Sequence, residues 1–372
     1  MARILVMGGF AESLVNFRGA LLLEMVASGH EVYACAPEAS AEVKAALAEM
    51  GVTYSPVALD RTGLNPIRDL FAIKSLAALF RSIKPDIFLG YTIKPVVYGS
   101  IAARIVGVPA IFSMITGLGY SFSGGSLKNK LVGGVAVFLY RLALKYNRHV
   151  FFQNPDDLAL FQQRGIIEDA NQAVLLNGSG VNIDIFNLTP YPPTPSFLMV
   201  ARLIREKGVY EYARAAREIR ERYPDVLFRL VGWIDDNPMA IDKDDLLVWE
   251  EEGVIDFLGR LSDVRTAIAQ SSVFVLPSYY REGTPRTILE AMAMGRPIIT
   301  TDAPGCRETV IEEINGYLVP VRDVSSLVDV MDKFIGQPAL VKKMGQASRE
   351  IAEEKYDVRK VNATILNALG IN

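Results

Sequence analysis

The N-terminal part of the chain alternates short apolar runs with longer amphipathic segments, and this alternation restricts the possible folds more than any other feature. The first apolar runs cover residues 3–7, 31–36 and 52–57, and the segments 14–27 and 40–50 separate them. Runs of five or six residues are typical of strands, and the segments between them have helical length. Strands that alternate with helices in this way form parallel, doubly wound sheets that bind ligands at the carboxyl ends of their strands. The pattern predicts an α/β fold.

A proline-rich stretch, Pro-Tyr-Pro-Pro-Thr-Pro at residues 190–195, divides the sequence. A continuous strand or helix does not pass through four prolines so close together, and the alternation starts again at Phe197. A chain of 372 residues is also long enough for two domains. We therefore predict domains at 1–189 and 197–355, a linker at 190–196 and a last helical segment at 356–372.

A strand–loop–helix unit carries the most informative polar residues. The apolar run 273–276 ends at Pro277, and Gly283 supplies a flexible backbone position. Thr284 and Pro285 fit the N-cap and the first position of a following helix. A helix N-terminus presents free N–H groups and partial positive charge to the loop before it, which is a favourable arrangement for phosphate.

Two carboxylates, Glu282 and Glu290, flank this helix start. Phosphate does not need carboxylates, so they indicate a neutral, hydroxyl-rich group beside the phosphate, as in a nucleotide sugar. One glutamate would then contact the sugar and the other the ribose. On these residues alone, an ordinary turn with two solvated glutamates stays an equal alternative.

Arg202 and Lys207 lie five residues apart, directly after the strand predicted at 197–201. Both can reach one phosphate group, arginine as a fork and lysine as a point charge. Taken alone, the pair also fits a solvated turn. Because the Glu282 unit belongs to the same predicted sheet, the phosphate interpretation is favoured.

Other kinds of site chemistry have little support. The two histidines, His30 and His149, do not follow a predicted strand, which disfavours a histidine base or a Ser/His or Cys/His triad. Residues 235–244 contain Asp-x-Asp spacing but form a polar stretch that we expect to be solvated loop, so no metal and no cofactor is predicted. Gly8-Gly9 follows the first strand without G-x-G-x-x-G spacing, which disfavours a dinucleotide oxidoreductase. Carboxylates and the phosphate oxygens of the substrate are left for proton transfer.

The charge is unevenly distributed. Residues 58–150 contain twelve Lys or Arg and three Asp, a net charge of +9 in a chain of net charge −3, which indicates an anionic partner. Helices predicted at 66–83 and 127–146 combine apolar residues with basic ones, which favours docking on an anionic membrane surface. Core helices with snorkelling basic ends are the alternative. The charges lie among residues such as Phe71 and Phe80 rather than a run of stackable aromatics, which disfavours nucleic acid.

Cys35 and Cys306 are too few and too far apart to form a disulfide framework, which favours a reducing cytoplasm. The apolar run 4–7 is too short for a signal-peptide core, and the apolar segment 131–140 is about half the length that a bilayer span needs. We expect a cytoplasmic protein that lies on a membrane without crossing it.

Glu282 and Glu290 resemble the E-x7-E motif of the retaining glycosyltransferases of the GT-B fold, in the fourth sequence family. Arg202 and Lys207 look like the diphosphate-binding pair of that family, and residues 177–186 resemble its N-G-V-D-x-x-x-F segment. More narrowly, three segments resemble the branch that extends polyprenyl-diphosphate-linked saccharides, including the undecaprenyl-diphosphate-bacillosamine α-1,3-N-acetylgalactosaminyltransferase-like enzymes and similar O-antigen enzymes. These segments are residues 16–18, 116–119 and 303–308.

The resemblance implies two Rossmann-like domains that face a central cleft, with the C-terminal helix crossing back to the first domain. It implies that Glu282 contacts the donor sugar and Glu290 the ribose, while Arg202 and Lys207 stabilise the departing diphosphate. Further donor contacts would be Gly8, Gly9, Gly232, Arg260, Gly283, Thr284 and Pro285. Candidate contacts of the acceptor or the membrane are Asn16, Arg18, Lys94, Thr116, Gly117, Lys128 and Lys130. Many members of the family carry a histidine where this chain has Thr116, so the role of that histidine is not carried over.

The function implied is metal-independent, retaining transfer of a sugar, such as N-acetylgalactosamine or a related hexose, from UDP to a polyprenyl-diphosphate-linked saccharide. The reaction would be a same-face displacement in which a donor phosphate oxygen helps deprotonate the acceptor, on the cytoplasmic face of a bacterial inner membrane. One alternative is a UDP-N-acetylglucosamine 2-epimerase-like enzyme, whose sites usually rely on histidines and acids that this chain lacks. The other is a non-catalytic protein that binds a nucleotide sugar or nucleic acid.

Overall fold

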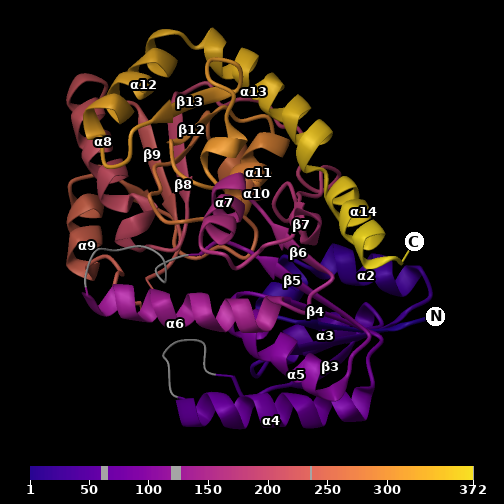
Figure 1. Ribbon diagram of the computed structural model, residues 1–372. Coiled ribbons are helices and arrows are strands. Elements are labelled where there is room, and N and C mark those ends of the chain that lie inside the picture. Colours follow the sequence, from indigo (N-terminus) through magenta and orange to yellow (C-terminus); the bar gives the residue numbers. More distant parts are fainter. Residues whose placement is uncertain (60–65, 119–126, 235–236, 372) are drawn as a thin grey trace. The chain divides into compact units, whose positions relative to one another are not determined.

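The chain forms two α/β units, each with its own hydrophobic core, in a computed structural model (Figure 1). The structure describes residues 1–59, 66–118, 127–234 and 237–371, with the backbone alone for 66, 67 and 127–132. Unit 1 comprises Met1–Ser179 and Val358–Asn372, and unit 2 comprises Gly180–Asp357. The predicted α/β class with two Rossmann-like sheets is confirmed.

Unit 1 contains a seven-stranded sheet in the order β3-β2-β1-β4-β5-β6-β7, with parallel pairing throughout. The strands are β1 (Arg3–Met7), β2 (Glu31–Ala36), β3 (Thr53–Pro56), β4 (Ile87–Tyr91), β5 (Ala110–Ile115), β6 (His149–Phe152) and β7 (Ala173–Leu175). The strand order reverses between β1 and β4, and open α/β sheets bind ligands outside the carboxyl ends of the strands at such a point.

Helices cover both faces of this sheet. They are α1 (Glu12–Asn16), α2 (Gly19–Ala27), α3 (Ala41–Glu49), α4 (Pro66–Ile83), η1 (Pro95–Gly99), α5 (Ser100–Val106), α6 (Leu127–Leu144), α7 (Pro155–Gln163), η3 (Ala170–Gln172) and α14 (Val358–Leu369). Successive residues of a strand point to opposite faces. In β1, Leu5 and Met7 pack with α4 to α7, whereas Ile4 and Val6 pack with α1 to α3 and α14.

The C-terminal helix α14 belongs to unit 1, as predicted. Its buried residues Val361, Ile365 and Leu366 join the same core as α2, and Asn362 Nδ2 donates to Glu24 Oε2 at 3.0 Å. The last helix therefore completes the first unit although it follows the second in sequence.

Unit 2 contains a six-stranded sheet in the order β10-β9-β8-β11-β12-β13, also with parallel pairing throughout. Its strands are β8 (Ser196–Val200), β9 (Leu227–Val231), β10 (Asp256–Phe257), β11 (Val273–Leu276), β12 (Ile298–Thr301) and β13 (Gly316–Val319). Its helices are η4 (Arg205–Lys207), α8 (Val209–Arg222), α9 (Lys243–Glu251), α10 (Arg265–Ala269), α11 (Arg286–Ala293), η5 (Arg307–Thr309), α12 (Val324–Gly336), α13 (Ala339–Ile351) and η6 (Ala352–Tyr356). Helix α8 packs beside α12, and α11 beside α13.

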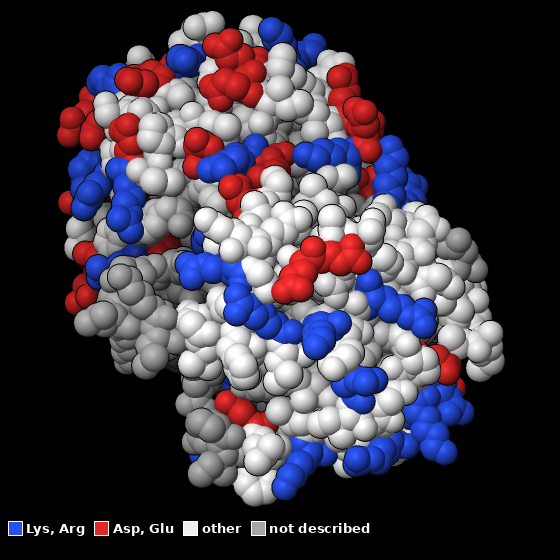
Figure 2. All heavy atoms as spheres, in the orientation of Figure 1, with Lys and Arg blue, Asp and Glu red and all other residues white. Residues whose placement is uncertain are grey.

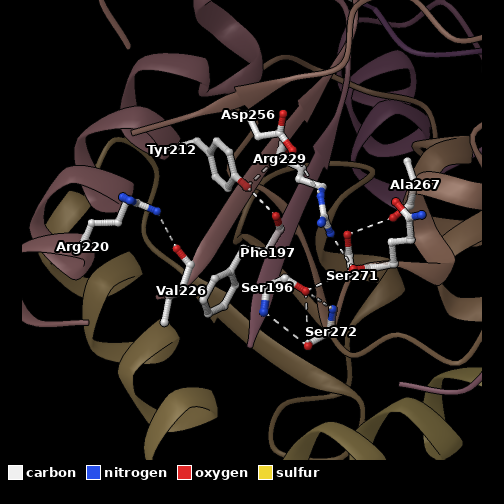
Figure 3. Close-up of polar contacts among 11 residues, drawn as sticks. Ser196, Phe197, Tyr212, Arg220, Val226, Arg229, Asp256, Ala267, Ser271 and Ser272 are labelled. Carbon is white, nitrogen blue, oxygen red and sulfur yellow. Dashed lines mark hydrogen bonds and ion pairs between the residues drawn. The ribbon is translucent and has the colours of Figure 1, made fainter. Parts of the chain in front are cut away.

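Short polar contacts join the amino ends of the central strands of unit 2 (Figure 3). The Tyr212 hydroxyl lies 3.0 Å from the carbonyl oxygen of Phe197 in β8 and 3.1 Å from that of Arg229 in β9. The backbone N–H of Ser272 donates to Ser196 Oγ at 3.1 Å, which joins the start of β8 to the residue before β11. These hydrogen bonds satisfy the buried backbone and hydroxyl groups at this edge of the sheet.

The structure differs from the predicted boundary between the domains. The chain passes from unit 1 to unit 2 between Ser179 and Gly180, so the predicted linker 190–196 lies within unit 2. Residue Val181 already belongs to unit 2, because its N–H donates to the carbonyl oxygen of Tyr356 at 2.8 Å. The buried guanidinium of Arg296 donates to the carbonyls of Thr189 and Pro190, so the proline-rich stretch is held against unit 2.

Three predicted elements are wrong in detail. The helix predicted at 14–27 is interrupted at Phe17–Arg18, where α1 ends and α2 begins. The segment 96–106, which the sequence predicts as one regular helix, begins instead with the π-helical turn η1. Part of the loop predicted at 235–244 is a helix start, since the Asp242 side chain accepts from the N–H of Asp244 at 3.0 Å and caps α9.

Candidate active site

Three loops meet at the carboxyl edge of the second sheet. They follow β8, β11 and β12, and since β8 and β12 both pair with β11, their ends lie side by side. The loop after β8 carries Arg202 and Lys207, and the loop after β11 carries Glu282. The structure thus brings together residues that lie 75 or more positions apart in the sequence, as the sequence predicts for one parallel sheet.

Glu282 is held by two partners at this edge. Lys207 Nζ forms an ion pair with Glu282 Oε1, and the Ser278 hydroxyl donates to the same oxygen at 3.1 Å. The side chains of Lys207 and Glu282 are only 12% and 11% exposed. Two opposite charges that are buried in this way stabilise each other, because burying an unpaired charge costs free energy. The carboxylate is therefore fixed in position at the edge where a ligand of this fold binds.

The carbonyl oxygen of Glu206 joins the first two loops. It accepts from the N–H groups of Tyr279 and Tyr280 at 2.9 and 3.0 Å. Gly208, with φ +79°, passes so close to Pro277 that an added Cβ would lie 2.1 Å from the Pro277 carbonyl oxygen. The turn that carries Lys207 is consequently locked against the turn that leads to Glu282.

Arg202 lies beside the same turns. Burial raises the pKa of the Tyr280 hydroxyl, and the nearby positive charge of Arg202 opposes that rise. Lys207 Nζ lies 5.4 Å from the centre of the Tyr280 ring. Both predicted phosphate-binding cations therefore lie around one aromatic side chain, although no sequence argument had placed Tyr280 between them.

Glu290 lies on α11 rather than on a loop, and it is 8% exposed. Arg286, one turn earlier, donates from Nε to Glu290 Oε1 at 2.9 Å. Burial raises the pKa of Glu290 above its ordinary value, and the ion pair with Arg286 opposes that rise only in part. The two glutamates of the motif therefore have different partners and different surroundings.

The start of α11 differs from the prediction by one residue. Pro285 occupies the N-cap position with an extended backbone, and the helix begins at Arg286, so Thr284 is not the N-cap. A proline side chain has no group that accepts a hydrogen bond, and the structure gives this cap no side-chain bond. Thr284 and Pro285 are both buried, and the loop they form leads directly from Glu282 into the helix.

The loop after β12 packs directly against the loop that carries Glu282. Gly305 has φ +83°, and a Cβ added to it would lie 1.9 Å from the Gly283 carbonyl oxygen and 2.8 Å from Glu282 Cβ. A glycine is required at such a close approach of two backbones. The buried Cys306 follows, and burial raises the pKa of its thiol to about 12.

The other two predicted donor contacts lie near the end of β9. A Cβ on Gly232 would lie 2.0 Å from the carbonyl oxygen of Ala201, so the ends of β8 and β9 are in close contact. The N–H of Leu203 donates to the Trp233 carbonyl at 3.0 Å, and the Arg260 guanidinium lies 4.7 Å from the Trp233 ring centre. Gly232 and Arg260 thus lie beside the loop that carries Arg202.

In unit 1, a second polar cluster lies at the switch point between β1 and β4. The hydroxyls of Ser13 and Tyr91 are 2.7 Å apart, and the buried Arg18 guanidinium lies 5.0 Å from the Tyr91 ring centre. A Cβ on Gly8 would lie 2.4 Å from the Tyr91 hydroxyl oxygen. A Cβ on Gly9 would lie 2.5 Å from the hydroxyl oxygen of Thr92, which follows Tyr91. Gly8, a predicted donor contact, and Arg18, a predicted acceptor contact, therefore belong to one cluster around Tyr91.

Comparison with known families covers most of the chain. Residues 17–178 match the family described as glycosyl transferase 4-like domain, and residues 182–351 match glycosyl transferases group 1. The chain is a group 1 glycosyltransferase of the GT-B fold. The resemblance seen in the sequence is confirmed at this level.

Relatives of this glycosyltransferase include enzymes that use lipid-linked acceptors. It is 27% identical over 85% of its length to the N,N'-diacetylbacillosaminyl-diphospho-undecaprenol alpha-1,3-N-acetylgalactosaminyltransferase of Campylobacter jejuni, of which 84% is covered. It is also 27% identical over 72% of its length to the UDP-Gal:alpha-D-GlcNAc-diphosphoundecaprenol alpha-1,3-galactosyltransferase of Escherichia coli, of which 71% is covered.

Solved structures show the same fold. Anabaena HepE in complex with UDP and glucose aligns over the full length of both chains with a TM-score of 0.78 and 19% identity. Sucrose-phosphate synthase from Thermosynechococcus elongatus aligns over 99% of this chain and 98% of its own, with a TM-score of 0.79 and 18% identity.

The remaining predicted residues of the glycosyltransferase lie in unit 1. Asn16 is exposed at the end of α1, and Lys94 pairs with Asp69 at 3.4 Å. Thr116 and Gly117 directly follow β5, with Gly117 at φ +102°. Two others, Lys128 and Lys130, are in α6, and their side chains lie outside the described residues.

Sequence reasoning missed three residues of the glycosyltransferase site. Ser278, which donates to Glu282, follows the apolar run 273–276 and was not predicted to belong to the site. Arg286 was not paired with Glu290, although their spacing of four in a predicted helix indicates such a pair. The role of Tyr91 had no local signal, because its partners Ser13 and Arg18 lie more than 70 residues away.

Proposed function

We propose that this glycosyltransferase moves a sugar from UDP to a polyprenyl-diphosphate-linked saccharide with retention of configuration. The observation that carries the proposal is the buried Glu282 carboxylate, fixed by Lys207 and Ser278 at the carboxyl edge of the second sheet. The relatives named above act on diphospho-undecaprenol-linked sugars by their names, which supports the acceptor class. N-acetylgalactosamine or a related hexose is the sugar we propose.

The donor would lie across the three loops of unit 2. Glu282 would accept hydrogen bonds from sugar hydroxyls, and Glu290 would do so from the ribose. Arg202 and Lys207 would contact the diphosphate, which leaves as UDP. Because both cations lie around Tyr280, they can face one diphosphate group.

The reaction we propose is a displacement on one face of the sugar. The bond from the anomeric carbon to the diphosphate oxygen breaks, and the acceptor hydroxyl oxygen bonds to that carbon on the same face. Its proton passes to a phosphate oxygen of the leaving UDP. Arg202 and Lys207 stabilise the negative charge that develops on the diphosphate, and this is the largest contribution we assign to the protein.

We also propose that the reaction needs no metal ion, because Arg202, Lys207 and the N-terminus of α11 supply positive charge for the diphosphate. The described residues contain no group of three or more His, Cys, Asp or Glu placed around one ion. Treatment with EDTA followed by gel filtration should leave turnover unchanged. Loss of turnover that Mg²⁺ or Mn²⁺ restores would contradict this part of the proposal.

The acceptor would approach unit 1, whose surface suits an anionic membrane. No helix among the described residues combines the length and apolar character that a bilayer span needs. On the face drawn in Figure 2, basic side chains predominate over the lower part of the molecule, where Figure 1 shows α4 and α6. We propose that the enzyme works as a peripheral protein on the cytoplasmic face of the inner membrane.

One part of this surface, here called the α5–α6 surface, is both apolar and basic. Its apolar members are at least 47% exposed, namely Ile105, Phe138, Leu142 and Tyr146. Arg104 and Lys145 lie over the Tyr146 ring at 4.3 and 5.9 Å. Exposed apolar side chains beside cations bind lipid interfaces by insertion together with attraction to anionic headgroups.

Liposome flotation tests the surface. Phe138→Ser should weaken binding to vesicles containing phosphatidylglycerol, while Leu247→Ser, a change at another exposed apolar residue, on α9 in unit 2, should not. Binding should also weaken at high salt. Equal effects of the two substitutions, or failure of the wild type to bind anionic vesicles at low salt, would contradict membrane docking.

A product assay tests the function itself. The purified protein is screened for thermal stabilisation by UDP-sugars, and the best is then incubated with polyprenyl-diphosphate-linked saccharides. We expect one extended lipid-linked product, whose anomeric configuration by NMR matches that of the donor. Conversion of a UDP-sugar without acceptor would favour the epimerase, binding without any product would favour the non-catalytic binder, and an inverted linkage would contradict retention.

A further inference from the structure

The passage of the chain out of unit 2 is built around one buried tyrosine. The π-helical turn η6 ends at Tyr356, immediately before the last residue of unit 2. The Tyr356 carbonyl accepts from the N–H of Val181, the second residue of unit 2, at 2.8 Å. The two chain segments that connect the units therefore meet at one place. We call this place, formed by Val181 and residues 355–357, the crossover. Turns of this kind are rare and are frequent at functional sites.

The Tyr356 side chain points away from the crossover to the loop after β12. Its hydroxyl donates to the carbonyl oxygen of Glu308 in η5, and Lys355 Nζ donates to the same oxygen at 3.0 Å. A carbonyl oxygen has two lone pairs, so both are used. Two consecutive residues of the crossover thus hold one backbone position of this loop.

The same loop supports the candidate active site. Gly305 lies three residues before Glu308, and its backbone is packed against Gly283 and Glu282 without room for a Cβ. A displacement of this loop would therefore displace Gly283 and Glu282 as well, because closely packed interiors transmit strain. A hydrogen bond therefore joins Tyr356 to Glu308, three residues of chain connect Glu308 to Gly305, and close packing joins Gly305 to Glu282.

We propose that Tyr356 is a positioning residue that ties Glu282 to the crossover, so that a change in the crossover moves the carboxylate. Tyr356 would touch no substrate and would act through the loop after β12. The role of Glu282 in this proposal rests on the proposed function. The alternative is that the Tyr356 hydroxyl serves only the stability of unit 2.

Tyr212 is a matched control for that alternative. It is also fully buried in unit 2, and its hydroxyl also bonds to backbone carbonyls, but at the opposite edge of the sheet (Figure 3). Both Tyr212→Phe and Tyr356→Phe should lower the temperature of unfolding. Only Tyr356→Phe should lower the affinity for the UDP-sugar and kcat/KM.

The test compares the affinities for UDP and for the stabilising UDP-sugar by calorimetry. Since Glu282 is placed on the sugar and the two cations on the diphosphate, Tyr356→Phe should lower UDP-sugar affinity and kcat/KM by about tenfold and leave UDP affinity unchanged. The double variant Lys355→Met/Tyr356→Phe should lose more, because the Glu308 carbonyl then keeps neither donor. Unchanged UDP-sugar affinity in Tyr356→Phe, or equal losses for UDP and UDP-sugar, would overturn the proposal.

Hydrogen exchange of the ligand-free protein separates this proposal from the proposed function. Amides in the peptide 279–289 should exchange faster in Tyr356→Phe than in the wild type and in Tyr212→Phe. If the wild type binds no nucleotide sugar, the proposed function fails, and this measurement alone decides the coupling. Equal exchange of that peptide in the two variants would overturn the coupling.

Discussion

At the amino edge of the second sheet, polar side chains such as Tyr212 and Ser196 bond to backbone groups of neighbouring strands (Figure 3). At the carboxyl edge, Glu282 is paired with Lys207 across two loops, and Glu290 is paired with Arg286. The first set contributes to stability with uncharged hydrogen bonds. The ion pairs at the carboxyl edge keep charged groups mostly out of water. This costs free energy and is expected at a ligand-binding site. Matched substitutions at the two edges should therefore affect activity differently.

The largest difference is expected for the cations. Lys207→Met should reduce kcat/KM by about 10²–10³-fold, because a group that stabilises the leaving diphosphate is lost. It should also destabilise the fold by about 3 kcal/mol, since the Glu282 carboxylate keeps its burial and loses its cation. The double variant Lys207→Met/Glu282→Gln should recover stability but not activity.

The control for this change is Arg229→Met at the amino edge. Arg229 bonds to the Gln270 carbonyl at 2.6 Å and to Asp256 at 3.4 Å, and Asp256 is 56% exposed. Removing Arg229 leaves no buried carboxylate, so urea unfolding should show a smaller loss and turnover should be close to normal. A Lys207→Met protein as stable as Arg229→Met would break the comparison.

The second effect concerns two glycines with similar backbones. Gly305→Ala would place a Cβ 1.9 Å from the Gly283 carbonyl oxygen, whereas Gly253, with φ +68°, has no atom within 4 Å of the added Cβ. We expect Gly305→Ala to lower kcat/KM by about 100-fold through displacement of the Glu282 loop. Gly253→Ala should cost only backbone strain of about 1 kcal/mol, seen in urea unfolding. Similar activities of the two variants would show that the loop contact is not needed.

The third comparison uses two buried serines. Ser278 donates to the Glu282 carboxylate at 3.1 Å, whereas Ser271 donates to the Ala267 carbonyl at 2.9 Å near the amino edge. A hydrogen bond to a charged group is worth about 1.5–3 kcal/mol, so Ser278→Ala should lower kcat/KM by about tenfold or more. Ser271→Ala should lower stability by about 1 kcal/mol and leave steady-state kinetics unchanged. Equal kinetics in both variants would argue against a role of Ser278 in orienting Glu282.

The smallest effect is a dependence of stability on pH at Glu290. Burial raises the pKa of Glu290 above its ordinary value of 4.5, so ionising it costs more in the folded protein than in the unfolded chain. Its contribution to stability is therefore fully present below pH 4.5 and is lost as the pH rises through the raised pKa. Glu290→Gln lacks this loss, so the free energy of unfolding of the wild type should fall relative to the variant between pH 4.5 and 7. A constant difference over this range would contradict the raised pKa.

Local patterns were sufficient for the strands and for many of the helices. Strand β1 has the bounds predicted for it, since a short apolar run and the two glycines that follow determine them locally. Helix α8 likewise has the bounds that the sequence predicts for it, 209–222, directly after Gly208. The break at Phe17–Arg18 and the π-helical turn η1 were missed, because they depend on packing against residues far away in the sequence. The cap at Asp242 was missed although the signal was present, since an aspartate before a partly apolar segment is a common helix start.

The site was predictable in its residue types but not in its pairings. A parallel sheet brings the loops after β8 and β11 to one edge, so Lys207 and Glu282 could be expected near each other. That they form an ion pair, with Ser278 as a second partner, depends on side-chain positions that no spacing in the sequence specifies. The contact of Tyr356 with Glu308 is of the same kind, since 48 residues separate them.

The central claim is that Glu282 holds the donor sugar for transfer, and the most direct test is the turnover of Glu282→Ala with a UDP-sugar and a polyprenyl-diphosphate-linked acceptor. Circular dichroism and thermal unfolding first establish that the variant is folded. We expect transfer to fall by at least about 100-fold, because a group that would orient the donor in the transition state is lost. Near-normal turnover by the folded variant would contradict the assignment of the site.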